Sequence, residues 1–153
     1  MGNKMTYHSR IPADPEYLQA LGRAVYNFTY FEWSVVWTIV KLSGDGFDNV
    51  PKGKPASEIA KALKSAIEKT TPPLSDALRR QLVKIDESYR VAIRRRNKLF
   101  HAHPYTATDG NQQLGGGGVE WPMTEVDSAA KMFEEAAIAS NGVFHGDLKK
   151  ERP

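Results

Sequence analysis

Two rows of apolar side chains run along residues 15 to 43 and constrain the fold more than any other feature. The first row steps by four and three residues in alternation: Leu21, Val25, Phe28, Glu32, Val35, Ile39 and Leu42. The second row repeats that spacing: Tyr26, Tyr30, Trp33, Trp37 and Val40. This periodicity is typical of one long helix. Because the rows lie about 200° apart at roughly 100° per residue, the helix needs partners on two sides, from its own chain or from a second subunit.

Residues that cap and break helices divide the rest of the chain into three further helices. Each helix is expected to begin at a side chain that accepts from free backbone N–H groups; these caps are Asp14, Ser57, Ser75 and Thr124, the last in a capping box with Asp127. Glycine and proline signals predict the helix ends, at about Ser43, Lys69, Pro104 and Ser140.

A long connection separates the third helix from the fourth. The Asp109-Gly110 pair lies between two short segments, 105–108 and 111–114, that are able to pair as a β-hairpin. Four consecutive glycines, Gly115 to Gly118, follow these segments and equally favour a flexible loop. We therefore expect either a long loop or a small hairpin between the two helices.

These elements predict an all-α protein, a four-helix up-down bundle with that loop or hairpin between helices three and four. A length of 153 residues fits one domain. We expect a flexible N-terminal arm over 1–13, a single helical domain over 14–146 and a charged tail over 147–153.

The composition excludes several kinds of function. The chain has no cysteine, which rules out disulfides, thiolate catalysis and Cys-based metal sites and suits a reducing compartment. No segment reaches the roughly 18 apolar residues of a membrane span. We therefore expect a cytoplasmic protein that does not bind a membrane.

One charge interrupts each of two apolar rows. Glu32 stands in the first row of the first helix, and Arg96 continues the row Leu82, Ile85, Tyr89 and Ile93 on the third helix. Buried charges are normally paired, so the spacing predicts that Glu32 and Arg96 meet inside the bundle. Such a pair is either purely structural or holds the Arg96 guanidinium stiffly beside a site.

One segment indicates a chemical function more specifically than the rest of the chain: Arg96-Asn97-Lys98-Leu99-Phe100-His101. Asn97 and His101 are one helical turn apart, so the amide is placed to orient the imidazole. A histidine moves protons near neutral pH, and an arginine stabilises the growing charge of a phosphate. Residues 88–108 contain no Asp or Glu, which suits a phosphate backbone but is also typical of a solvated basic helix face.

Arg96, Asn97 and His101, at the end of a long third helix, resemble the ribonuclease motif of the HEPN (higher eukaryotes and prokaryotes nucleotide-binding) superfamily. The architectural resemblance covers about residues 14–142, including a long first helix with the inward acidic residue Glu32. It implies a homodimer whose two motifs face one cleft, and metal-independent cleavage of RNA that leaves a cyclic phosphate. The glycine-rich connection matches no motif of this family.

The sequence thus predicts a metal-independent endoribonuclease of the toxin or defence type. Arg96, Asn97 and His101 are the expected catalytic residues, with Glu32 as structural support. The expected substrate-binding residues are Arg95, Lys98, His103 and Tyr105. We expect RNA as substrate, a homodimer, an antitoxin protein as a further partner, and neither a cofactor nor a metal. The alternatives are a non-catalytic helical module that binds nucleic acid, nucleotide or protein, and a structural dimerisation domain.

Overall fold

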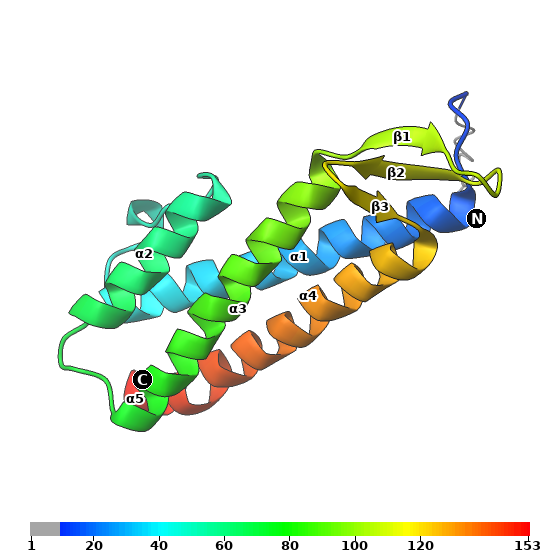
Figure 1. The fold of residues 1–153 in the computed structure, drawn as a ribbon. Coiled ribbons are helices and arrows are strands. Elements are labelled where there is room, and N and C mark those ends of the chain that lie inside the picture. The colour runs from blue at the N-terminus through cyan, green and yellow to red at the C-terminus, as the bar shows by residue number, and fades with distance from the viewer. Residues whose placement is uncertain (1–9) are drawn as a thin grey trace, which may run out of the picture.

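The computed structural model describes residues 10–153, most of which are helical (Figure 1). The helices are α1 (Pro15–Ser43), α2 (Ala56–Lys69), α3 (Asp76–Phe100), α4 (Met123–Val143) and α5 (Lys149–Glu151), with shorter helical turns at Phe47–Asn49 and Phe144–Leu148. The strands are β1 (His103–Thr106), β2 (Gln112–Gly116) and β3 (Val119–Trp121). The prediction of a mainly helical chain is confirmed. Within residues 10–153 no helix has both the length and the apolarity that crossing a membrane requires.

Helix α1 begins and ends where its sequence predicts. The Asp14 carboxylate accepts from the Glu16 backbone N–H at 2.8 Å. Gly44 closes the helix with a φ of 68°, a conformation that glycine adopts without a steric cost. Most of the arm predicted over 1–13 lies outside the described residues.

The two apolar rows of α1 differ in how far they are buried. Phe28, Val35 and Ile39 of the first row are buried in the core, together with residues of α2, α3 and α4. The second row supplies four side chains that are 40 to 69% exposed; we call Tyr26, Tyr30, Trp33 and Trp37 the aromatic row. Within residues 10–153, therefore, the chain does not wrap both faces of α1.

Helices α1 and α4 run in the same direction. The Asn27 side chain donates to the Ala130 carbonyl oxygen at 3.0 Å, and further along both helices the Ser34 hydroxyl donates to the Ser140 hydroxyl at 2.7 Å. In Figure 1 both helices start beside the sheet and lead away from it. The first and fourth helices of an up-down bundle are antiparallel, so the predicted up-down order is wrong. The connection after Gly44 leads the chain back before α2 starts, which places α2 along α1 instead of reversing it.

Two of the predicted helix caps are also wrong. Helix α2 begins after Pro55 rather than at Ser57, and α4 begins after Pro122 with no capping box from Thr124 and Asp127. Neither start has a side-chain cap. Both prolines have extended ψ angles, so each ends the preceding segment and sets the direction in which its helix begins. The cap predicted for α3 is confirmed, because the Ser75 hydroxyl accepts from a first-turn N–H.

The connection after α3 is a three-stranded antiparallel sheet in the order β1-β2-β3. Tyr105 pairs with Gln113 across the Asp109-Gly110 turn, so the hairpin alternative is correct and the flexible loop is not. Strand β3 was not predicted, and it pairs Trp121 with Leu114. Gly117 and Gly118, with φ of 61° and 76°, form the turn between β2 and β3, where two residues with positive φ match the twist of a tight hairpin.

The chain stays ordered beyond the predicted end of the fourth helix. Helix α4 runs through Gly142 to Val143, and helical turns continue to Glu151. Leu148 is fully buried, and the Glu151 carboxylate accepts from the Ser75 backbone N–H at 3.2 Å. The residues assigned to a charged tail over 147–153 therefore pack against the start of α3.

Replacing Tyr17 by Phe should loosen the sheet from the helices. The buried Tyr17 hydroxyl donates to the Trp121 carbonyl at 2.6 Å and accepts from the Leu114 N–H at 2.9 Å. Its loss leaves two backbone groups without this partner and should lower the free energy of unfolding by about 1–3 kcal/mol. Urea titration measures this. The control is Tyr26→Phe on the exposed aromatic row, which should stay within about 0.5 kcal/mol of the parent; equal effects of the two changes would contradict the prediction.

Candidate functional site

The C-terminal end of α3 approaches α1 and the start of α2 around a pocket of about 350 Å³. Helix α3 contributes Arg96 and Asn97, and α1 contributes Glu32. The full lining is Glu32, Lys54, Pro55, Ala56, Ser57, Ile93, Arg96 and Asn97. The pocket thus joins three residues of the predicted site with the N-terminus of α2, which sequence reasoning had not connected with them.

Arg96 lies over two aromatic rings. Its guanidinium carbon lies 5.3 Å from the centre of the Phe28 ring and 4.7 Å from that of Phe100. One terminal nitrogen donates to the Asn97 side-chain oxygen at 2.9 Å, while Nε is buried and has no hydrogen-bond partner in the described residues. Stacking on two rings fixes the plane of the guanidinium and leaves it without a carboxylate partner.

The predicted Glu32–Arg96 ion pair is wrong. Within residues 10–153 no carboxylate lies within ion-pair distance of Arg96, and the Glu32 carboxylate accepts instead from the Tyr89 hydroxyl at 2.6 Å. Tyr89 belongs to the same apolar row as Arg96, two turns earlier, and is fully buried, so its hydroxyl needs a partner inside the protein. Glu32 supplies that partner, and Arg96 turns to Asn97 and the two rings.

The charges of this region still influence each other. Burial raises the pKa of Tyr89, and the hydrogen bond to Glu32 and the charge of that carboxylate raise it further. Arg96 acts in the opposite direction and lowers the pKa of Tyr89. Glu32 and Arg96 therefore form a charge-complementary environment around one neutral phenol without touching each other.

Asn97 does not orient His101 as the spacing predicts. Its side-chain oxygen accepts from Arg96, and no side-chain hydrogen bond joins it to His101 in the described part of the chain. The link between these two residues is the helical bond from the His101 N–H to the Asn97 carbonyl oxygen at 3.0 Å. His101 directly follows α3 as its C-cap residue, and its imidazole is exposed to solvent. Asn97 thus positions the arginine of the motif and leaves the histidine free to meet a ligand.

The predicted substrate-binding residues separate into two groups. Arg95 pairs with Glu125 of α4 at 2.7 Å and lies over the Trp121 ring, so it fastens α3 to α4. Lys98 is exposed and makes no ion pair among residues 10–153, and the same is true of Arg94. Besides Arg96, these two cations of the acid-free window remain available to an anionic ligand.

His103 and Tyr105 lie on β1 and line a shallow groove of about 570 Å³ on the outer face of the sheet. Glu120 lines the same groove from β3, and sequence reasoning missed it. The signal that was available is the glycine run before it, which places bare backbone between the strands. Within residues 10–153 no cluster of three or more His, Asp or Glu side chains is arranged to hold a metal ion.

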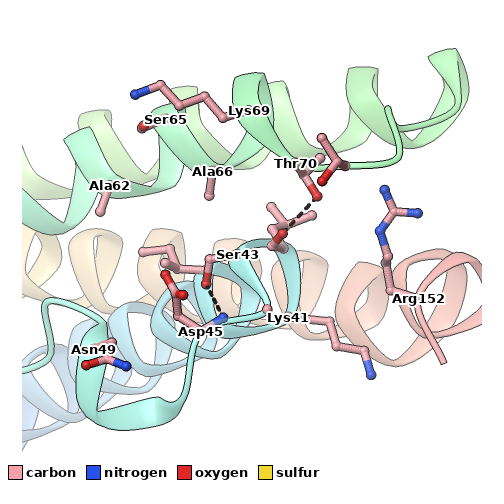
Figure 2. Close-up of a pocket in the computed structure, with 14 residues that line it drawn as sticks. Lys41, Ser43, Asp45, Asn49, Ala62, Ser65, Ala66, Lys69, Thr70 and Arg152 are labelled. Atoms are coloured by element: carbon pink, nitrogen blue, oxygen red, sulfur yellow. Dashed lines mark hydrogen bonds between the residues drawn. The ribbon is translucent and has the colours of Figure 1, made fainter.

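A further pocket of about 500 Å³ lies at the opposite ends of α1 and α2 (Figure 2). Lys41 and Lys69 stand in the last turns of these helices, where a cation complements the helix dipole. Figure 2 shows their amino groups pointing in different directions. Because the cations do not converge on one point, the helix dipoles explain them and we assign this pocket no ligand.

Replacing Tyr89 by Phe should destabilise the protein at neutral pH. The change removes the donor to the half-buried Glu32 carboxylate and should lower the free energy of unfolding by about 1–3 kcal/mol. Above pH 10 the difference from the parent should narrow, because the raised pKa keeps the phenol protonated in the folded state while the unfolded chain releases its proton. Urea titrations of both proteins at pH 8 and pH 11 provide the test, and an unchanged difference would contradict it.

No known protein family, curated protein or solved structure matched the chain in the comparisons made.

Proposed function

We propose that this protein is a metal-independent endoribonuclease of the HEPN type that acts as a homodimer on cytoplasmic RNA, in a toxin or defence role. The observation that carries the proposal is the state of Arg96. Its guanidinium lies over the rings of Phe28 and Phe100 and engages no carboxylate among residues 10–153. A fixed cation without a counter-charge suits a phosphate whose charge increases in the transition state.

The proposed reaction is attack by the RNA on itself. The exposed His101 imidazole takes the proton of a 2′-hydroxyl, and the 2′-oxygen then forms a bond to the adjacent phosphorus. The bond from phosphorus to the 5′-oxygen breaks, and the imidazolium of the facing motif in a second copy supplies the proton that this oxygen needs. Arg96 stabilises the negative charge on the phosphate. The products are a 2′,3′-cyclic phosphate and a free 5′-hydroxyl.

The role of Asn97 in this reaction differs from the one that its spacing predicts. Its side-chain oxygen holds a terminal nitrogen of Arg96, so it positions the cation rather than the imidazole. The exposed cations Arg94 and Lys98 stand on the same helix end and attract the backbone on either side of the reacting phosphate.

The aromatic row supports the homodimer. Its four side chains are exposed along more than two turns of α1, and Trp33 and Trp37 also pack against Phe47 at ring distances of 5.4 and 5.0 Å. Aromatic residues are enriched in the cores of protein interfaces. The same surface favours the second candidate function, a non-catalytic module that binds a protein partner.

His101→Ala should lower RNA cleavage by at least about 10²–10⁴-fold, the usual contribution of general acid–base catalysis. Arg96→Lys should also be severely impaired, because an ammonium lacks the planar fork and its stacking on two rings. The assay is cleavage of total or transfer RNA by the purified protein with a chelator present. His145→Ala and Arg80→Lys are the matched controls on exposed residues outside the proposed site, with thermal unfolding measured for every variant. An inert parent protein, or cleavage that needs a divalent metal and ignores His101, would favour the binding module.

Sedimentation should show a dimer at tens of micromolar protein. Replacing Trp33 and Trp37 together by Ser should shift the protein toward monomer while its circular dichroism stays unchanged, since both side chains are about half exposed in one copy. A parent protein that sediments as a monomer contradicts the dimer. A dimer that ignores both changes contradicts the aromatic row as its interface.

A further inference from the structure

The outer face of the sheet holds a slot between two of its strands. Gly115 of β2 pairs with His103 on one side and with Glu120 on the other. Residues directly opposite in antiparallel strands project to the same face, so these three positions form one row across the sheet. The middle position has no side chain, and the outer strands lie roughly 10 Å apart, twice the spacing of neighbouring strands. His103 and Glu120 thus flank a position without a side chain, which leaves room for an aromatic ring to lie against the backbone.

The rings of Tyr105 and His103 lie against the backbone of Gly115 and Gly116. A Cβ on Gly115 would lie 2.6 Å from the Tyr105 ring, and one on Gly116 would lie 2.8 Å from the His103 ring. The rings therefore occupy space that only glycine leaves open. The Tyr105 hydroxyl also accepts from the Gln113 side-chain nitrogen at 2.6 Å, which fixes one ring in place. Aromatic rings fixed on a sheet surface are the usual platform on which unpaired bases of single-stranded RNA stack.

The charge in the groove decides which part of an RNA fits there. Glu120 supplies the carboxylate of the lining, and it makes no hydrogen bond or ion pair within residues 10–153. A free carboxylate repels a phosphate but accepts hydrogen bonds from a base edge that carries N–H groups. Guanine is the RNA base that presents an imino and an amino donor side by side, which a carboxylate accepts in a bidentate manner.

We propose that this groove is a guanine-binding subsite for single-stranded RNA, in which the base stacks on His103 and Tyr105 and its N1–H and N2–H groups donate to Glu120. This rests on the proposed function in one respect, that RNA is the ligand. Strand β1 follows the helix end that carries His101 after a single residue, so the subsite lies next to the proposed cleavage motif. Glu120 is then the residue that determines specificity.

Fluorescence anisotropy with 2′-O-methyl RNA tests the subsite without cleavage, because the attacking hydroxyl is blocked. The probes are labelled uridine hexamers in which one internal position is guanosine, inosine, adenosine or uridine. The guanosine probe should bind at least about fivefold more tightly than the all-uridine probe. Inosine, which lacks the amino group, should fall between them. Glu120→Gln should remove the preference, so that this variant binds the guanosine and all-uridine probes equally, whereas the matched control Glu87→Gln on exposed α3 should keep it.

The outcomes separate this inference from the proposed function. Cleavage by the parent protein together with equal binding of all four probes overturns the subsite and leaves the ribonuclease standing. A guanosine preference that Glu120→Gln abolishes, in a protein that cleaves no RNA, supports the subsite and overturns the ribonuclease. A preference that survives in Glu120→Gln overturns the assigned role of Glu120, and no binding to any probe overturns the subsite altogether.

Discussion

The ring of Phe28 is the point at which the helices and the charged motif meet. It stacks with Tyr89 of α3 at 6.3 Å and meets Phe133 of α4 edge-on at 5.4 Å. The Arg96 guanidinium lies against the same ring. Aromatic pairs of this kind stabilise a core beyond the area they bury, and a guanidinium over a ring face gains from the ring's quadrupole. The packing that joins α1, α3 and α4 therefore also positions the guanidinium of Arg96.

Some parts of this arrangement follow from the sequence because they depend on local chemistry. The limits of α1 follow from Asp14 and Gly44, and the start of α3 from Ser75, since each satisfies backbone groups of its own helix. The hairpin across Asp109-Gly110 is likewise a matter of turn conformation. The mainly helical character of the chain follows from the periodic rows of apolar residues.

Other parts depend on how distant segments pack, and periodicity carries no information about that. Two charges in apolar rows predict an ion pair between Glu32 and Arg96. The Glu32 carboxylate accepts from the Tyr89 hydroxyl instead, because Tyr89 is fully buried and its hydroxyl needs a partner inside the protein. Helical spacing favours a contact between Asn97 and His101, one turn further on, yet the Asn97 side-chain oxygen accepts from its neighbour Arg96. The direction of α4 relative to α1 follows from the connection after Gly44, which leads the chain back before α2 starts and which no periodic pattern marks.

The three tryptophans of this chain occupy two very different surroundings. Trp121 is fully buried, and its indole nitrogen has no hydrogen-bond partner in the described residues, whereas Trp33 and Trp37 are 47 and 40% exposed. The buried indole should emit at shorter wavelength and resist quenching by iodide, while the surface pair should emit further to the red and be quenched readily. The intrinsic fluorescence thus contains two separable signals. One reports whether the sheet is docked on the helices, and the other reports what covers the outer face of α1.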